Sequence, residues 1–263
     1  MGRAVARRLG AGRRLLIADL DNDALRSVAA DLSAAGHDVS SVELDVSDAG
    51  AVAAFAERAG GLGAVRTLVH TAGLSPVQAT ADAIIRVDLL GVALVLDEFA
   101  KIIAPGGAGV VISSMAGHLA PTVDPEDEQQ LARTPSRELL SLPALEMSRH
   151  TDPGLTYAFA KRANQIRVRA ASVEWGRCGA RLNSISPGII ATPMGRAELQ
   201  GPNGSFMRAL VEQSGCRRLG TPDDLAAVIE FLVGSAASFI TGVDLLVDGG
   251  VVAALTTDQV NLG

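Results

Sequence analysis

The stretch Leu155-Thr156-Tyr157-Ala158-Phe159-Ala160-Lys161-Arg162-Ala163-Asn164 contains the only tyrosine of this 263-residue chain and one of its two lysines. The pattern between Pro153-Gly154 and Gly176 predicts a helix, so Tyr157 and Lys161 would share one face, about 6 Å apart along the axis. A phenol titrates near pH ~10, and a neighbouring ammonium stabilises its ionised form. The pair therefore suits acid–base chemistry, although a partly buried tyrosine beside an exposed lysine would show the same spacing. Because nearly all other basic residues are arginine, a lysine at this position favours the chemical interpretation.

Composition indicates an ordinary globular protein, with 48% hydrophobic and 20% charged residues. The net charge of −6 and the lack of a long basic run argue against nucleic-acid binding. Cys178 and Cys216 are too few for a disulfide framework or a zinc site, which favours a reducing compartment. The first residues lack the apolar core of a secretion signal, and no apolar run reaches membrane-spanning length. We expect a cytoplasmic protein without metal, nucleic-acid or membrane partners.

Strand and helix patterns alternate along the chain, which predicts an α/β fold with a parallel, doubly wound sheet in a single domain, residues 1–263. The strands are expected at 14–19, 39–44, 65–70, 109–114, 181–185 and 243–247. The helices are expected at 2–9, 21–35, 47–59, 80–103, 153–176 and 222–232. Residues 118–152 interrupt this alternation with proline, charge and leucine. We predict an insertion there, near the active site, with short helices that start at Pro125 and Pro135.

Seven short motifs follow one another in a fixed order over nearly the whole chain. They are Asp19, Asp45-Val46, Thr71-Ala72-Gly73, Ser113-Ser114, Tyr157 with Lys161, Pro187-Gly188 with Thr192-Pro193-Met194, and Asp248-Gly249-Gly250. Together they resemble the classical short-chain dehydrogenase/reductase family, which implies a mostly parallel Rossmann-type sheet. The resemblance also implies catalytic roles. Tyr157 would be the general acid/base, Ser114 would hydrogen-bond the substrate carbonyl, and Lys161 would hold the nicotinamide ribose and lower the pKa of Tyr157.

Asp19 predicts the cofactor. A carboxylate that ends this strand can accept hydrogen bonds from ribose hydroxyls and would repel a 2′-phosphate, which favours NAD over NADP. The alternative is that Asp19 only caps the next helix. The resemblance implies that residues 196–215 form a helix that acts as a mobile lid over the substrate. It assigns cofactor binding to Gly2, Asp19, Asp45, Val46, Ala72, Gly73, Tyr157, Lys161, Pro187, Gly188, Ile190 and Thr192.

The chain departs from the family pattern in two places. The family begins with a strand and a glycine-rich turn, and here Gly2 matches the last glycine of that turn. We therefore expect an N-terminally truncated family member, whose sheet lacks the usual first strand between 15–19 and 65–70. The second departure is Asp88, where the family usually has an asparagine that positions a water beside the lysine. An ionised aspartate accepts hydrogen bonds and cannot donate them.

The expected function is NAD-dependent interconversion of a secondary alcohol and a ketone by hydride transfer, with Ser114, Tyr157, Lys161 and Asp88 as the catalytic residues. The insertion resembles one in bacterial 3α-hydroxysteroid dehydrogenase/carbonyl reductases, which implies a bulky apolar ketone as the small-molecule substrate, and the alternative is a solvated excursion without a role. The family resemblance implies a homodimer or homotetramer. Two other functions remain open: an NADPH-dependent 3-oxoacyl-thioester reductase, and a catalytically silent nucleotide sensor or scaffold.

Overall fold

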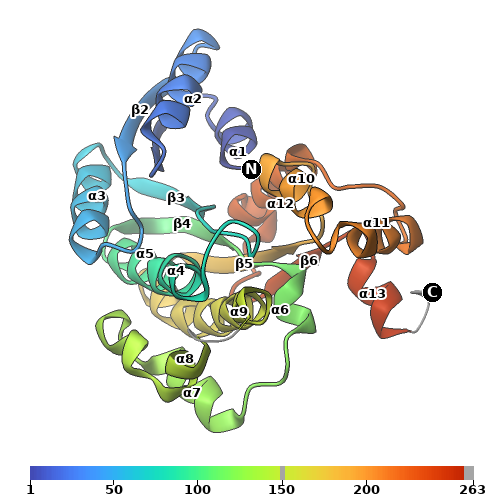
Figure 1. Cartoon of the computed structure of the whole chain (residues 1–263). Coiled ribbons are helices and arrows are strands. Elements are labelled where there is room, and N and C mark those ends of the chain that lie inside the picture. The colour runs from blue at the N-terminus through green and yellow to red at the C-terminus, as the bar shows by residue number, and fades with distance from the viewer. Residues whose placement is uncertain (149–151, 258–263) are drawn as a thin grey trace.

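The protein is described by a computed structural model that covers residues 1–148 and 152–257. All its strands pair in parallel, as two separate sheets (Figure 1). The smaller sheet pairs β1 (Arg14–Asp19) with β2 (Asp38–Glu43). The larger sheet has the order β3 (Val65–His70), β4 (Ile103–Ile112), β5 (Arg181–Pro187) and β6 (Asp244–Val247). The predicted α/β class is confirmed, and within the described chain no strand joins β1 to β3.

Helices cover both faces of the larger sheet (Figure 1). Helices α5 and α9 pack on one face, whereas α12 packs on the other with α1 beside it. The helices are α1 (Gly2–Leu9), α2 (Asn22–Ala34), α3 (Ala49–Gly61), α4 (Ala81–Ile84), α5 (Val92–Ala100), α6 (Met115–Leu119), α7 (Pro125–Arg133), α8 (Pro143–Ser148), α9 (Pro153–Arg177), α10 (Pro193–Gln200), α11 (Gly204–Gln213), α12 (Pro222–Val233) and α13 (Val251–Thr256). In the described residues no helix is both long and apolar enough to cross a membrane.

The predicted helix that carries Tyr157 is confirmed as α9, and its start has a clear local cause. The Asp152 carboxylate accepts hydrogen bonds from the backbone N–H groups of Gly154 (2.8 Å) and Leu155 (3.2 Å). Pro153 occupies the first helical position, where its missing N–H costs nothing. At the other end of α9, the buried Trp175 packs directly on β4, and a Cβ on Gly109 would lie 2.7 Å from its ring. Glycine at this strand position therefore lets the helix approach the sheet closely.

Two predicted helices are wrong in detail. Residues 80–103 do not form one helix, because α4 is followed by a π-helical segment at Ile85–Gly91 and only then by α5. Residues 196–215 form two helices, α10 and α11, which are separated at Gly201. Strand β4 also begins at Ile103, well before the predicted 109, because Ile103 pairs with Val65 and the strand then passes through an irregularity before Ala108 pairs with Thr67.

The insertion is packed against the core, so the alternative of a solvated excursion is wrong. Three of its six leucines are fully buried among side chains of the π-helical segment and of α9; they are Leu131, Leu139 and Leu145. The Arg167 guanidinium of α9 donates hydrogen bonds to the carbonyl oxygens of Leu131 (2.8 Å) and Thr134 (3.0 Å) at the end of α7. Pro125 begins α7 as predicted, and Pro135 immediately precedes a 3₁₀ helix at Ser136–Ser141.

Candidate active site

Four predicted catalytic residues come together beside the carboxyl ends of β3 and β4. The Nζ atom of Lys161 lies 3.0 Å from Oδ2 of Asp88 and 5.3 Å from the centre of the Tyr157 ring. The Ser114 side chain is close enough to the Tyr157 phenol to lower the pKa of the tyrosine. Since Asp88 comes from the π-helical segment, Ser114 from the end of β4 and the other two from α9, three separate elements build this cluster.

Backbone contacts fix Asp88 in this position. The Leu74 N–H, in the loop after β3, donates a 2.7 Å hydrogen bond to Asp88 Oδ1. A Cβ on Gly73 would lie 3.3 Å from Lys161 Nζ and 3.4 Å from Asp88 Oδ2. Glycine at this position therefore allows the backbone to lie directly over the buried ion pair. The wide π-helical turn places Asp88 on the inner side of its helix, where it is fully buried.

The two neighbouring serines have different partners. The Ser113 hydroxyl donates a 2.8 Å hydrogen bond to the Lys161 carbonyl oxygen, which ties the end of β4 to α9. The Ser114 hydroxyl accepts a 3.2 Å hydrogen bond from the Ala116 N–H at the start of α6. Ser114, and not Ser113, is the serine that lowers the pKa of Tyr157.

The pKa of Tyr157 lies above its ordinary value, whereas we expected it to be lowered. Burial is the largest cause, and the negative charges of Asp88 and Glu198 act in the same direction. The Lys161 ammonium and the Ser114 hydrogen bond lower the pKa but do not outweigh burial and the two carboxylates. The prediction that Lys161 lowers the pKa of Tyr157 did not include the negative charge of Asp88, which offsets much of the positive charge of the lysine.

The Lys161–Asp88 pair is best described as a buried ion pair. The attraction of Asp88 and Tyr157 raises the pKa of Lys161 despite its burial, which keeps the lysine protonated. Burial raises the pKa of Asp88 more than the lysine and the Leu74 N–H lower it. The 3.0 Å separation of Lys161 Nζ and Asp88 Oδ2 favours the charged form of both groups.

His70, at the end of β3, is a buried base that the sequence analysis did not single out. Its side chain is 5% exposed, and its Nε2 atom has no hydrogen-bond partner among the described residues. Burial, and then the positive charge of Lys161, lower its pKa to about 4. The histidine is therefore neutral at neutral pH, and protonating it would place a second cation beside the lysine.

We expect His70 to make the fold sensitive to acid. Its folded pKa of about 4 is below the unfolded value of 6.5, so its contribution is complete above pH 6.5 and is lost as the pH falls towards 4. The free energy of unfolding should fall by about 3 kcal/mol over this window from this residue alone. Urea unfolding of wild type and His70→Gln across the window checks this. Equal pH dependence in both proteins would contradict it.

The residues assigned to the adenosine half of a cofactor lie at the carboxyl ends of β1 and β2. Asp19 is exposed, and its Oδ1 accepts a 3.0 Å hydrogen bond from the Asp21 N–H. Asp21, and not Asp19, caps α2, so the helix-cap alternative for Asp19 is wrong. Asp45 is exposed and accepts hydrogen bonds from both the N–H and the hydroxyl of Ser47. Val46 is buried against Gly91, at the end of the π-helical segment.

The remaining predicted cofactor residues lie along the same edge of the sheets. Gly2 is the first residue of α1, and a Cβ on it would lie 3.0 Å from Oγ1 of Thr71, next to Ala72. Pro187 ends β5, and Gly188 allows a close approach of Asp248, to which a Cβ would come within 2.7 Å. Ile190 is buried and Thr192 caps α10, where its Oγ1 accepts from the Gly195 N–H. This edge offers hydrogen-bonding groups for a nucleotide from Asp19 to Lys161.

Glu198 is a functional candidate that the sequence analysis missed. It lies on α10, is partly buried, and its charge raises the pKa of Tyr157. Burial also raises the pKa of Glu198 itself. No motif marks this residue, because only the packing of α10 decides which of its charges act on the tyrosine.

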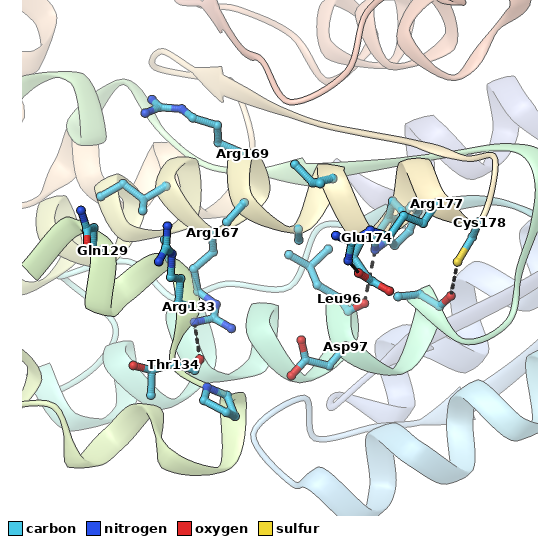
Figure 2. Close-up of a pocket in the computed structure, with 18 of the residues that line it drawn as sticks. Leu96, Asp97, Gln129, Arg133, Thr134, Arg167, Arg169, Glu174, Arg177 and Cys178 are labelled. Atoms are coloured by element: carbon cyan, nitrogen blue, oxygen red, sulfur yellow. Dashed lines mark hydrogen bonds and ion pairs between the residues drawn. The ribbon is translucent and has the colours of Figure 1, made fainter.

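A separate groove of about 1260 Å³ lies between α5, α7 and α9 (Figure 2). Arg167 and Arg133 extend into it from α9 and α7, and Asp97 of α5 lies opposite. The α9 residues that line it begin at Ile166, so neither Tyr157 nor Lys161 contributes. The groove is therefore formed by the insertion and the outer side of α9, away from the catalytic cluster.

Comparison with known proteins places the chain in a family. A family model described as "Enoyl-(Acyl carrier protein) reductase" matches residues 1–124 and 138–252. A "Short-chain dehydrogenase/reductase bsc3" from Alternaria brassicicola is 42% identical over 98% of this chain and 94% of its own length. The chain belongs to the short-chain dehydrogenase/reductase family. Its predicted resemblance to that family is confirmed, and the chain is an NAD(P)-type oxidoreductase of alcohols or ketones.

More distant similarities agree with this family. A "3-alpha-hydroxysteroid dehydrogenase/carbonyl reductase" from Comamonas testosteroni is 32% identical over 87% of this chain and 92% of its own length. A crystal structure of a "Short-chain dehydrogenase/reductase SDR:Glucose/ribitol dehydrogenase" from Brucella melitensis has a TM-score of 0.75 at 27% identity, over 95% of this chain and 91% of that one. The family fold therefore extends over nearly all of residues 1–263.

Proposed function

We propose that this short-chain dehydrogenase/reductase interconverts a secondary alcohol and a ketone, with NAD as its cofactor and Tyr157 as general acid/base. The observation that carries the proposal is the cluster of Ser114, Tyr157, Lys161 and Asp88, in which the ammonium lies 5.3 Å from the phenol ring centre and 3.0 Å from the carboxylate. A purely structural tyrosine would not need a buried lysine and aspartate pair beside its ring.

Each side chain has a defined part in the proposed mechanism. In alcohol oxidation, the Tyr157 phenolate accepts the substrate hydroxyl proton while the Ser114 hydroxyl donates a hydrogen bond to the substrate oxygen. In ketone reduction, the Tyr157 phenol donates that proton. Lys161 stabilises the phenolate, and Asp88 holds the lysine ammonium in place. Nicotinamide, when bound, supplies the hydride acceptor or donor.

The proposed mechanism sets the direction of the pH dependence. Oxidation requires the phenolate, and the pKa of Tyr157 is raised by burial and by two carboxylates. Alcohol oxidation should therefore accelerate as the pH rises through the alkaline range, and ketone reduction should be favoured at lower pH. Lys161 would also bind the nicotinamide ribose of the cofactor, and Asp19 would bind the ribose at the adenosine end.

We predict that Asp19 sets the preference for NAD. Replacing it with alanine removes an exposed carboxylate that would repel a 2′-phosphate, so the ratio of kcat/KM for NAD to that for NADP should fall about tenfold, the equivalent of ~1.4 kcal/mol. Steady-state kinetics with both cofactors checks this. Asp223→Ala, which removes an equally exposed carboxylate from α12, is the matched control and should leave the ratio unchanged. Equal use of both cofactors by the wild type would contradict the assignment.

Two alternative functions make different demands. An NADPH-dependent 3-oxoacyl-thioester reductase would require that the site tolerate a 2′-phosphate near Asp19, and its 3-oxoacyl substrates would be turned over with NADPH. A catalytically silent sensor would bind nucleotide without turnover.

The packed insertion favours a role for that segment beside the active site, and we retain a bulky ketone as one substrate candidate. We also propose that the protein forms a homodimer or homotetramer.

We further propose that residues 1–148 and 152–257, which the structure describes, contain no counterpart of the family's first strand. Support comes from the gap between β1 and β3, each of which pairs with one neighbour on its other side in the described residues. The first described helix, α1, lies near this gap, with Gly2 against Thr71. A strand placed between β1 and β3 would hydrogen-bond both and join the two sheets.

A further inference from the structure

Helix α6 begins directly after Ser114 and is little more than one turn long. The Ser114 hydroxyl accepts a hydrogen bond from the Ala116 N–H (3.2 Å), and the Ser114 carbonyl oxygen accepts one from the Gly117 N–H (3.0 Å). A helix this short does not hold its shape alone, because forming the first turn fixes several residues for a single hydrogen bond. The direction of the Ser114 hydroxyl therefore depends on what holds α6 in place.

Few apolar contacts hold α6. Gly117 is the only buried residue of this helix, and it lies so close to α9 that a Cβ would come within 2.7 Å of Nε2 of Gln165. Met115 is partly buried, and Leu119 at the other end is 42% exposed. Because glycine contributes no side chain, the contact at Gly117 limits the distance between α6 and α9 more than it limits the rotation of α6.

A polar contact anchors the end of α6 that lies away from Ser114. Nε2 of His118 lies 2.7 Å from Oδ2 of Asp244, on β6, and Figure 1 shows α6 close to this strand. Asp244 is itself held in place, because β6 pairs with β5 and Oδ1 of Asp244 accepts a 2.5 Å hydrogen bond from the Ser184 hydroxyl of β5. The side chains of His118 and Asp244 are 28% and 12% exposed, so water screens their contact only in part.

We propose that His118 is a positioning residue: by binding Asp244 it holds α6 so that the Ser114 hydroxyl lies beside Tyr157, where the substrate oxygen would bind. The proposal rests on the proposed function, in which Ser114 hydrogen-bonds that oxygen. His118 takes no part in proton or hydride transfer itself. A hydrogen bond has a preferred length and direction, so it fixes the rotation of a single helical turn more strictly than an apolar contact of the same size.

The kinetics of four proteins test this role: the wild type, His118→Ala, Ser114→Ala and the double variant. With cyclohexanol and NAD, His118→Ala should lower kcat about tenfold and change KM less than about twofold, because the hydroxyl is misplaced while the substrate-binding surface remains. In the Ser114→Ala background the same substitution should change kcat less than about twofold, because the hydroxyl that His118 positions is gone. Equal losses in both backgrounds would overturn the proposal.

Two further variants separate positioning from a general effect of removing a surface contact. His118→Gln places an amide N–H near the position of Nε2, so kcat should recover to within about threefold of wild type. Arg14→Ala removes an exposed ion pair with Asp38 (3.1 Å) at the amino ends of β1 and β2, and it should leave kcat unchanged. A loss in His118→Gln as large as in His118→Ala, or an equal loss in Arg14→Ala, would contradict a positioning role.

The position of Ser114 can also be followed without substrate or cofactor. Tyr157 is the only tyrosine, so the near-ultraviolet absorbance of tyrosinate during an alkaline titration reports its pKa alone. The Ser114 side chain lowers this pKa, so His118→Ala and Ser114→Ala should both shift the titration to higher pH. The double variant should shift it no further than Ser114→Ala. An unshifted titration in His118→Ala would overturn the role of His118.

The two measurements distinguish this proposal from the proposed function. An absence of turnover by the wild type with cyclohexanol, with a wider set of secondary alcohols and with the corresponding ketones would overturn the proposed function. The titration would then still decide whether His118 positions the Ser114 hydroxyl beside Tyr157.

Discussion

Tyr157→Phe should abolish turnover, with kcat at least about 10³-fold below wild type, because it removes the one hydroxyl in the cluster that can exchange a proton with the substrate oxygen. The ring stays, so its packing among the buried side chains of α9 and the insertion should persist. The measurement is steady-state oxidation of a secondary alcohol with NAD, together with a titration of NAD binding.

Two controls give this result its meaning. Thermal unfolding should show a fold as stable as wild type, and NAD affinity should change little, since Lys161 and Asp88 remain. Activity above a tenth of the wild-type value would remove Tyr157 from the mechanism. Loss of NAD binding together with activity would instead show that the hydroxyl serves the cofactor.

Lys161→Met is expected to lose both turnover and stability. The lysine is 4% exposed, and removing its ammonium leaves the fully buried Asp88 carboxylate with only the Leu74 N–H as partner. Breaking a buried pair from one side costs about 3–5 kcal/mol, so the free energy of unfolding should fall by that amount in urea denaturation at neutral pH. Turnover should fall because the phenolate loses its stabilising charge.

A second substitution separates the two losses. In Lys161→Met/Asp88→Asn the buried charge is gone from both sides, so most of the lost stability should return while turnover stays low. Asp88→Asn alone should lower the pKa of Tyr157, because the lysine charge is no longer offset. If the double variant is no more stable than Lys161→Met, the pair does not carry the stability that we assign to it.

Local sequence signals were sufficient for most of the elements. The predicted bounds of α1, β1 and β3 agree with the structure, because glycine or aspartate lies at or beside an end of each element. The helix that carries Tyr157 and Lys161 begins at its proline and aspartate cap as expected. The family motifs also predicted the position of Ser114. A residue that directly follows a strand can be placed once the end of that strand is predicted.

Other features could not be predicted from local patterns, because they depend on contacts between distant segments. The hydrophobic pattern of residues 80–103 predicts one continuous helix. The π-helical turn that buries the Asp88 carboxylate occurs where Val46 packs against Gly91 and Gly73 lies close to Asp88, and neither contact can be predicted from the local sequence. Burial and charges from distant segments also determine the pKa of Tyr157. The sequence predicted a lysine that lowers the pKa of Tyr157, whereas Asp88 and Glu198, brought from two other elements, act against it.

The sequence by itself therefore determined which residues could do the chemistry: a tyrosine and a lysine one helical turn apart, a serine at a strand end, and an aspartate where a nucleotide ribose would bind. The spacing of side chains along a helix or strand is a local property, so it can be predicted from neighbouring residues. The tertiary structure alone decided the electrostatics of the site, in which Asp88 and Glu198 raise the pKa of Tyr157. Desolvation and charge–charge interactions depend on distances through space, and these arise only when α9, α10 and the segment around Asp88 pack together.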